Sequence, residues 1–262
     1  MYNFEFVKPA SLADAIAALG REGAQALSGG QSLLPSMKMR LNQPEALVSL
    51  TGIAELKGVL VNGDEVTVGG ATPHAVVARD LVTAYPAMAG LAARIGDPAV
   101  RNRGTIGGSL ANNDPAACYP AGVLASNGVI VTDRREIAVD DFFMGMFTTA
   151  LEEGEIITSV RFMIPKRAAY AKFIQPASRF SLTSVYVAEY WDGARVAITG
   201  ASTEGVFRWS EAEAALSESF TPEAIAGLTM PAGDLISDLH GTAEYRAHLC
   251  KVMTKRAVLE AI

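Results

Sequence analysis

The chain has 262 residues, a net charge of −6 and a pI near 5.2, and half of its residues are hydrophobic. This length predicts one large or two small domains with a substantial core, and a charged fraction of only 19% argues against long disordered segments. An acidic chain offers no basic face to nucleic acid or to an anionic membrane. No apolar run approaches the roughly 20 residues of a membrane span, and the first residues lack the pattern of a signal peptide. We therefore expect a cytoplasmic protein that has no nucleic-acid partner and no membrane span.

Residues that bind metals are scarce. There are two cysteines, Cys118 and Cys250, and three histidines, which have no partner at the usual metal-site spacings except a loose acidic neighbourhood around His240. Two thiolates cannot hold an iron–sulfur cluster or a zinc site that needs four. Redox chemistry would therefore need an organic cofactor, with any metals on another chain. Cys118 has no His/Asp set near it in the sequence, so a small buried side chain is favoured over a nucleophile. We assign neither a catalytic residue nor a metal ligand.

The N-terminal segment predicts a small β/α unit. Ser11 and Asp14 resemble a capping box, and apolar residues on one face predict a helix over 12–19. Short strands are expected over 25–27 and 46–50.

The next segment predicts a hairpin and several further elements. Asn62-Gly63 indicates a two-residue turn between strands 59–61 and 66–68. Thr72-Pro73 is typical of a helix N-cap followed by proline, leading into a helix over 74–79. Beyond it we expect a small apolar helix over 119–125 and strands over 129–131, 137–139 and 156–162.

The pattern changes after Pro165-Lys166-Arg167, the best candidate for a domain boundary. Asp192-Gly193 predicts a hairpin between strands 184–191 and 194–200, and helices are expected near 210–216 and 222–228. A long helix is expected over 242–262, with an apolar face formed by Tyr245, Leu249, Val252, Met253 and Leu259. Strands followed by helices indicate a separate α+β domain.

Two glycine-rich loops are the candidates for ligand binding. The first runs from Ser28 to Leu33 and follows a predicted strand, and the second is Thr105-Ile106-Gly107-Gly108-Ser109. Neither is a P-loop or a Gly-x-Gly-x-x-Gly fingerprint. Paired glycines leave backbone N–H groups free to cradle an anion, although each loop alone also fits an ordinary tight turn. Two such loops, 77 residues apart from Gly30 to Gly107, could clasp the diphosphate of a dinucleotide without many lysines, which suits an acidic protein.

The loops carry a family resemblance. The segment 4–19, the loop Ser-Gly-Gly-Gln-Ser-Leu-Leu-Pro at 28–35, Gly-Ala-Thr at 70–72 and the motif at 105–120 resemble the FAD-binding medium subunit of molybdenum hydroxylases. This family includes the flavoprotein subunit of carbon monoxide dehydrogenase and the flavin domain of xanthine dehydrogenase. The segment 245–249 is similar to the family's C-terminal helix, so the resemblance covers nearly the whole chain.

The resemblance implies an α+β fold. A two-part FAD-binding domain of the PCMH/vanillyl-alcohol-oxidase-like type would span 1–166, with subdomains of about 1–54 and 55–166. A small α+β domain of antiparallel sheet and helices would span 167–262.

The resemblance also implies FAD, with its diphosphate between the two loops. The FAD would be held non-covalently, because position 31 is glutamine and not the histidine that anchors flavin in some relatives of this fold. Lys172 matches a lysine near the flavin, and Phe180 an aromatic near the isoalloxazine ring. A solvated strand lysine and a core aromatic are the alternatives for these two. The full set of expected cofactor-binding residues is Leu27, Ser28, Gly29, Gly30, Gln31, Ser32, Leu33, Thr72, Thr105, Ile106, Gly107, Gly108, Ser109, Asp114, Cys118, Lys172 and Phe180.

Three positions depart from the family pattern. Ser109 stands where the family usually has Asn, and Arg179 where relatives tend to have Asp. Cys118 replaces an Asp whose carboxylate contacts ribose hydroxyls, and a thiol is a weak hydrogen-bonding group. A lost hydrogen bond of about 1.5–3 kcal/mol would weaken FAD binding roughly tenfold to a hundredfold.

Three functions are therefore considered. The favoured one is an FAD-binding electron-transfer subunit in a dimer of heterotrimers. A large partner would hold molybdopterin, a small partner would hold two [2Fe–2S] clusters, and this chain would pass electrons to an external acceptor. The second is a free-standing flavin oxidoreductase, for which no general acid or base stands out. The third is a structural subunit that has lost FAD.

Overall fold

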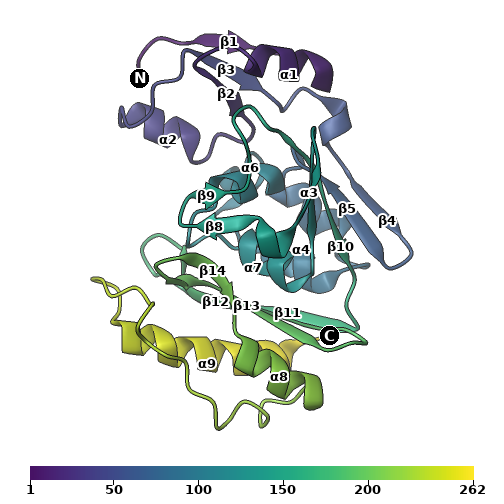
Figure 1. The fold of residues 1–262 in the computed structure, drawn as a ribbon, viewed down its shortest axis with the longest axis vertical. Coiled ribbons are helices and arrows are strands. Elements are labelled where there is room, and N and C mark those ends of the chain that lie inside the picture. The colour runs from purple at the N-terminus through teal and green to yellow at the C-terminus, as the bar shows by residue number, and fades with distance from the viewer.

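Three larger β-sheets follow one another along the long axis of the molecule (Figure 1), and a fourth sheet has only two strands. The computed structural model describes all residues from 1 to 262. Parallel strands build the first sheet, and antiparallel strands build the second and third. This mixture of sheets and flanking helices is the α+β fold that the sequence predicts. None of the helices has the length and apolar composition that crossing a membrane requires.

The first sheet is a small unit at the N-terminal end, with strand order β1-β3-β2. The Ser11 hydroxyl caps its first helix by accepting a hydrogen bond from the Asp14 amide at 3.1 Å, as predicted. Ala15 and Leu19 then pack against Val48 in a small apolar cluster. The elements are β1 (Glu5–Val7), α1 (Leu12–Leu19), β2 (Ala24–Leu27), α2 (Leu33–Lys38), β3 (Ala46–Ser49) and the 3₁₀ turn η1 (Ala54–Leu56).

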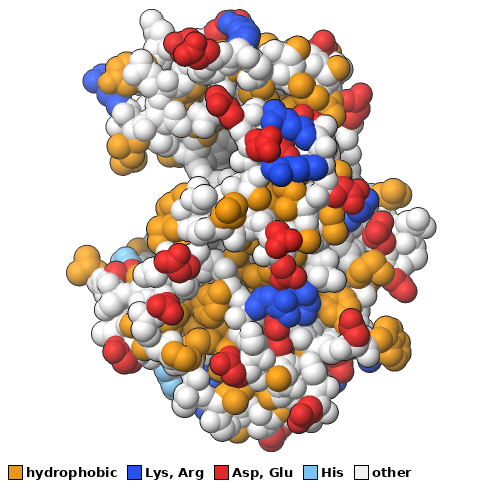
Figure 2. All heavy atoms as spheres, in the orientation of Figure 1, with side chains coloured by type: hydrophobic (Ala, Val, Ile, Leu, Met, Phe, Trp, Pro, Cys, Tyr) orange, Lys and Arg blue, Asp and Glu red, His pale blue; other side chains and the backbone are white.

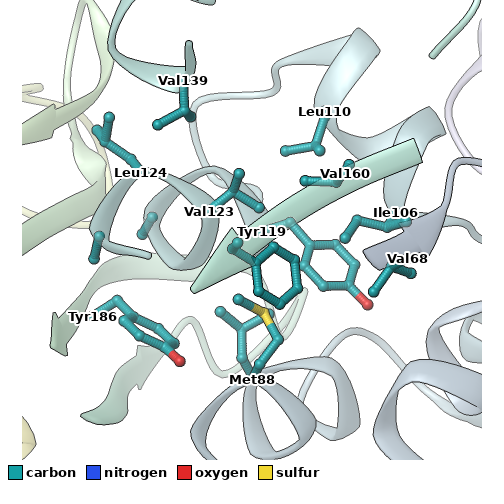
Figure 3. Packing of buried hydrophobic residues seen from close by; sticks show 14 of the residues in the cluster. Val68, Met88, Ile106, Leu110, Tyr119, Val123, Leu124, Val139, Val160 and Tyr186 are labelled. Atoms are coloured by element: carbon teal, nitrogen blue, oxygen red, sulfur yellow. The ribbon is translucent and has the colours of Figure 1, made fainter. Parts of the chain in front are cut away.

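The second sheet has the order β4-β5-β10-β6-β7 and supports the largest core of the molecule. Figure 3 shows how Tyr119 and Val123 lie among Ile106, Leu110 and Val160 in this core. The strands are β4 (Val59–Asn62), β5 (Glu65–Gly69), β6 (Val129–Thr132), β7 (Glu136–Ala138) and β10 (Ile157–Met163). The helices are α3 (His74–Asp80), α4 (Pro86–Ala93), α5 (Pro98–Arg101), α6 (Ile106–Asn112) and α7 (Tyr119–Ala125). The turn η2 (Val139–Asp141) precedes a small hairpin of β8 (Phe143–Gly145) and β9 (Thr148–Thr149).

The third sheet is buried on both faces. In its strand β12, Val185 and Val187 face the C-terminal helices, whereas Tyr186 and Ala188 join the core around α7. Because neighbouring side chains of a strand point to opposite faces, a sheet covered on both sides needs apolar residues at nearly every position. The elements are β11 (Arg167–Ile174), β12 (Ser181–Glu189), β13 (Ala194–Ser202), β14 (Gly205–Arg208), α8 (Ser210–Glu218) and α9 (Ala243–Glu260).

The predicted hairpin turn is displaced by one residue. Asn62 still pairs with Glu65, so the two-residue loop is Gly63-Asp64 and not Asn62-Gly63. Gly63 has a φ of 59°, the left-handed conformation that glycine adopts without steric cost.

The predicted cap at Thr72 is wrong. The Thr72 hydroxyl donates to the Gly58 carbonyl at 3.1 Å and accepts from the Gly58 amide at 2.9 Å. Its side chain therefore ties two loops together, and helix α3 begins at His74 without a side-chain cap.

The predicted helix over 222–228 is also wrong, because this segment forms consecutive turns. The Ala224 amide donates to the Thr221 carbonyl, and the Ala226 amide to the Glu223 carbonyl.

The predicted hairpin at Asp192-Gly193 has a longer loop of residues 190–193, since Glu189 pairs with Ala194. Trp191, expected at the end of a strand, is therefore almost fully exposed.

Only part of the predicted apolar face of the last helix is correct. Leu249 and Met253 are buried, but Leu259 is 73% exposed and Tyr245 42% exposed. Small side chains such as Ala247 occupy the buried side instead, and they let α9 lie close to the sheet.

The different burial of Met253 and Leu259 on α9 predicts different effects for two alanine substitutions. Met253→Ala is expected to lower the free energy of unfolding by about 2–5 kcal/mol, because it leaves a cavity in the C-terminal core. Leu259→Ala, which removes an exposed side chain from the same helix, is expected to change it by about 0.5 kcal/mol or less. Denaturant titration measures both values. Equal losses would mean that Leu259 is buried and the assignment of the helix face is wrong.

Candidate functional site

A cavity of about 1150 Å³ lies where the first sheet meets the rest of the molecule. Figure 2 shows the surface hollowed in this region, below α2 of Figure 1. Ligand sites for small molecules usually enclose about 300–1000 Å³, so this cavity suits a large, extended ligand. Residues from the first, second and third sheets all contribute to its wall, and both glycine loops line it.

The first glycine loop connects β2 to α2 and exposes donors. Gly30 has a φ of 70°, and a Cβ there would also collide with Leu34. The backbone N–H groups of Gly29, Gly30, Gln31 and Ser32 donate no hydrogen bond within the chain. Four successive free amides at a cavity wall form the kind of nest that binds an anion.

The second glycine loop leads into α6, and the amides of its two glycines and of Ser109 already have partners within the chain. The Gly107 amide donates to the Gly70 carbonyl at 2.9 Å, and the Gly108 amide to the Thr105 hydroxyl at 3.2 Å. The Ser109 amide donates to the Thr105 carbonyl. Amides of the second loop as donors to a ligand therefore stay a prediction, because those of Gly107, Gly108 and Ser109 already bond to Gly70 and Thr105.

The two loops nevertheless meet directly, as the sequence predicts. The Ser28 and Thr105 hydroxyl oxygens lie 2.7 Å apart in a hydrogen bond. A Cβ at Gly29 would collide with the Arg103 carbonyl, and a Cβ at Gly108 would lie 3.5 Å from the Ser28 Cβ. Glycine is therefore required at position 29, where the two backbones approach too closely for a side chain, whereas position 108 leaves room for little more than a Cβ.

The cavity gathers nearly all of the predicted site residues. Those that line it are Leu27, Ser28, Gly29, Gly30, Gln31, Ser32, Leu33, Thr105, Gly107, Gly108, Ser109, Asp114, Cys118, Lys172 and Phe180. Two do not. Thr72 is fully buried and bonded to Gly58, and Ile106 is fully buried in the main core. Both support the loops from behind.

Lys172 and Cys118 lie together in the cavity wall. The Lys172 ammonium donates to the Cys118 sulfur at 3.4 Å and to the Arg94 carbonyl at 3.1 Å. Phe180 is 57% exposed, in the loop between β11 and β12. The Asp114 carboxylate accepts a hydrogen bond from the Ala116 amide, so part of its hydrogen-bonding capacity is spent on its own turn.

Glu155 lines the cavity and was not predicted. Its side chain is completely buried. Burial opposes its ionisation, but the Arg135 guanidinium, the Glu152 amide and the Thr132 hydroxyl outweigh that effect and lower the pKa of Glu155 to about 2. The carboxylate is therefore ionised at neutral pH and cross-links loops around the cavity.

His74 is a second residue that the sequence did not assign to the site. Burial and the nearby charge of Arg101 lower the pKa of His74 to about 4, so the ring is neutral at physiological pH. Its Nδ1 atom is buried without a hydrogen-bond partner. A Cβ at Gly104 would collide with the imidazole, so that glycine lets the ring pack beside the second loop.

Other parts of the wall come from segments with no motif of their own. Because they are scattered along the chain, only the fold brings them together. They include Gln25, Asn42, Leu50, Ile95, Asp97, Val100, Leu151, Ile156, Ile157, Ala177, Ser178 and Arg179.

Comparisons with known proteins identify a family. The family model "FAD binding domain in molybdopterin dehydrogenase" matches residues 2–166. The chain is 35% identical to the nicotine 6-hydroxylase medium subunit of Paenarthrobacter nicotinovorans, across 98% of this chain and 96% of that protein. It is 34% identical to the carbon monoxide dehydrogenase medium chain of Hydrogenophaga pseudoflava, with the same coverage.

Solved structures share the whole fold. Reconstituted CO dehydrogenase from Oligotropha carboxidovorans superimposes with a TM-score of 0.88 at 30% identity, covering 98% of this chain and 97% of that chain. Quinoline 2-oxidoreductase from Pseudomonas putida 86 gives a TM-score of 0.87 at 28% identity, covering 99% and 96%.

The chain thus belongs to the family of FAD-binding medium subunits of molybdenum hydroxylases, and its cofactor is FAD. It is a subunit of a multi-subunit oxidoreductase. The residues present fit this cofactor, since free amides and a side-chain-free junction between two loops provide room and donors for a diphosphate.

The buried carboxylate of Glu155 predicts a specific dependence of stability on pH. Its pKa of about 2 in the folded chain lies below its ordinary value of 4.5, so its ionised form stabilises the fold above pH 4.5. Glu155→Gln is expected to lower the free energy of unfolding by about 3 kcal/mol at neutral pH. The difference from the parent chain should shrink as the pH falls from 4.5 through 2.

Denaturant titrations over this pH range measure the effect. Glu153→Gln, which alters an exposed carboxylate two residues away, is the control and should change stability little. A loss for Glu155→Gln that does not depend on pH would contradict the assigned role of the ionised carboxylate.

Proposed function

We propose that this chain is the electron-transfer subunit of a molybdenum-containing hydroxylase. FAD would occupy the cavity, receive electrons from iron–sulfur clusters of a partner subunit and pass them to an external acceptor. The observation that carries this proposal is the meeting of two glycine loops at one cavity wall, with four consecutive free amides on the first loop. The bound flavin would supply the redox chemistry, and the protein would bind and orient it.

The cofactor-binding residues proposed here have different tasks. The amides from Gly29 to Ser32 would donate to the diphosphate, whose negative charge they can bind without a cationic side chain. The Ser28–Thr105 hydrogen bond would hold the two loops at the right separation. Lys172, which donates to the Arg94 carbonyl, would place a positive charge in the cavity wall.

The finer details of assembly are also proposals. The relatives are named as medium chains or medium subunits, and this supports a large subunit with molybdopterin and a small subunit with two [2Fe–2S] clusters. We propose a dimer of such heterotrimers in the cytoplasm. We also propose the division into an FAD-binding domain over 1–166 and a C-terminal domain over 167–262, across which the main core is shared.

Neither alternative function gains support from the site. A free-standing oxidoreductase needs a general acid or base over the flavin. The titratable side chains of the wall include Glu155, which is tied to Arg135, and His74, which packs beside Gly104. A structural subunit without FAD would not need a large cavity with unpaired amides, and both features are retained despite Cys118 and Ser109.

Isolation of the native complex through a tag on this chain tests the proposed function. We expect FAD, molybdenum and iron to co-purify in a constant ratio with two further chains. FAD without the metals would support the free-standing oxidoreductase and contradict the proposal. Metals without FAD would support the structural subunit and contradict it as well.

A bulky side chain at the loop junction is predicted to block the cofactor. In Gly108→Val the Cβ would lie 3.0 Å from the Thr105 hydroxyl and 3.5 Å from the Ser28 Cβ, between the two loops. We expect FAD affinity to fall at least about tenfold, because one or more hydrogen bonds of about 1.5 kcal/mol each would be lost. Quenching of flavin fluorescence on titration measures the affinity.

Gly90→Val is the matched control, since a Cβ at that position of α4 meets nothing within 4 Å. It should leave FAD affinity unchanged. Gly107→Val is a less clean probe, because its Cβ would collide with the Gly70 backbone behind the loop. Unchanged FAD affinity in Gly108→Val would remove the loop junction from the site.

A further inference from the structure

A second pocket, of about 410 Å³, lies at one edge of the first sheet. Its wall includes the residues that follow each of the three strands, namely Lys8 and Pro9 after β1, Ser28 after β2, and Thr51 and Gly52 after β3. The strands are parallel, so their carboxyl ends meet at the same edge of the sheet. Open sheets of parallel strands typically bind ligands at this edge.

The pocket is separate from the cavity assigned to FAD. Leu27 and Ser28 are the only residues that line both. The residues from Gly29 to Ser32, whose amides are proposed to bind the diphosphate, line the cavity alone. A ligand in the second pocket would therefore meet a different set of donors.

Two cations and no carboxylate line this pocket, although the chain has a net charge of −6. Lys8 and Arg103 form no ion pair within the chain. Glu5, the carboxylate nearest to Lys8 in the sequence, pairs with Arg21 instead. The Lys8 ammonium lies 5.4 Å from the centroid of the Phe6 ring, which also lines the pocket. The pocket is therefore a locally positive region that favours an anion.

Neutral donors accompany the two charges. The backbone N–H groups of Thr51 and Gly52 donate no hydrogen bond within the chain. Ser49 is only 8% exposed, and its hydroxyl oxygen lies 3.1 Å from that of Thr51. Free amides, hydroxyls and an arginine–lysine pair are donors that suit phosphate, because the cations supply charge and the amides supply directed N–H groups.

We propose that this pocket binds a small phosphate monoester. The phosphate group pairs with Lys8 and Arg103 and accepts hydrogen bonds from the segment Thr51–Gly52. A phosphate group alone does not fill a pocket of about 410 Å³. Apolar side chains are available for the organic part of the ester, and they belong to Phe6, Pro9 and Leu27. The inference does not depend on whether the chain binds FAD.

Titration calorimetry of the full chain with phenyl phosphate tests the role of the two cations. Lys8→Gln and Arg103→Gln alter exposed side chains, so both variants should fold, and each is expected to weaken binding at least about tenfold. Lys57→Gln is the matched control, since it changes the net charge equally at an exposed lysine that does not line the pocket. Phenyl phosphate held by the first glycine loop would bind all three variants alike, and that result would overturn the proposal.

Chemical protection locates the ligand independently of affinity. The amines of the full chain are acetylated with and without saturating phenyl phosphate, and the labelled peptides are quantified by mass spectrometry. We expect the ligand to slow acetylation of Lys8 at least about fivefold and to leave Lys57 unaffected. Equal rates at Lys8 with and without the ligand would overturn the proposal.

A comparison of two probes decides whether the ligand is an ester. Phenyl phosphate is expected to bind at least about fivefold more tightly than inorganic phosphate, because its ring can bury apolar surface against Phe6 and Pro9. Equal affinities that are both lost in Arg103→Gln would overturn the assignment to an ester and identify a site for free phosphate.

Discussion

The contact between the two glycine loops is the constraint on which the site depends. The Ser28–Thr105 hydrogen bond joins segments 77 residues apart, and Gly29 beside it lets the backbones approach more closely than a side chain would allow. One neutral hydrogen bond contributes only about 1 kcal/mol, so the contact must be positioned by what lies behind it. Thr72 and Ile106 do this from the buried side, the first by fixing its loop to Gly58 and the second by packing into the main core.

The two loops have the same residue types but different tasks. In the second loop the amides of Gly108 and Ser109 complete the start of α6, the Gly107 amide donates to Gly70, and the Thr105 hydroxyl both caps the helix and bonds to Ser28. In the first loop the chain turns from strand to helix with Gly30 at positive φ, and the amides from Gly29 to Ser32 remain free. Composition identifies both loops as ligand-binding candidates, but which amides are free depends on the hydrogen bonds each loop makes with its neighbours.

Local signals allowed much of the fold to be predicted. The cap at Ser11 depends on neighbouring residues and is confirmed, and both glycine loops line one cavity. Predictions failed where tertiary contacts override local preference. Thr72 resembles a cap but bonds to Gly58, and the buried side of α9 is set by its fit to the sheet and not by its largest apolar residues. Glu155 has no motif, because its partner Arg135 belongs to another loop that only the fold brings close.

The pairing of Cys118 with Lys172 shows how the third sheet contributes to the cavity. Cys118 precedes α7, and Lys172 belongs to β11, which lies beyond the predicted domain boundary. Tyr119 of α7 and Tyr170 of β11 are buried in the same core, so the sulfur and the ammonium are positioned by packing across that boundary. An independent C-terminal domain joined by a flexible linker could not hold two side chains at hydrogen-bonding distance, since domain motion would separate them. The shared core therefore positions the Cys118–Lys172 part of the cavity wall, and the loop junction positions the glycine loops.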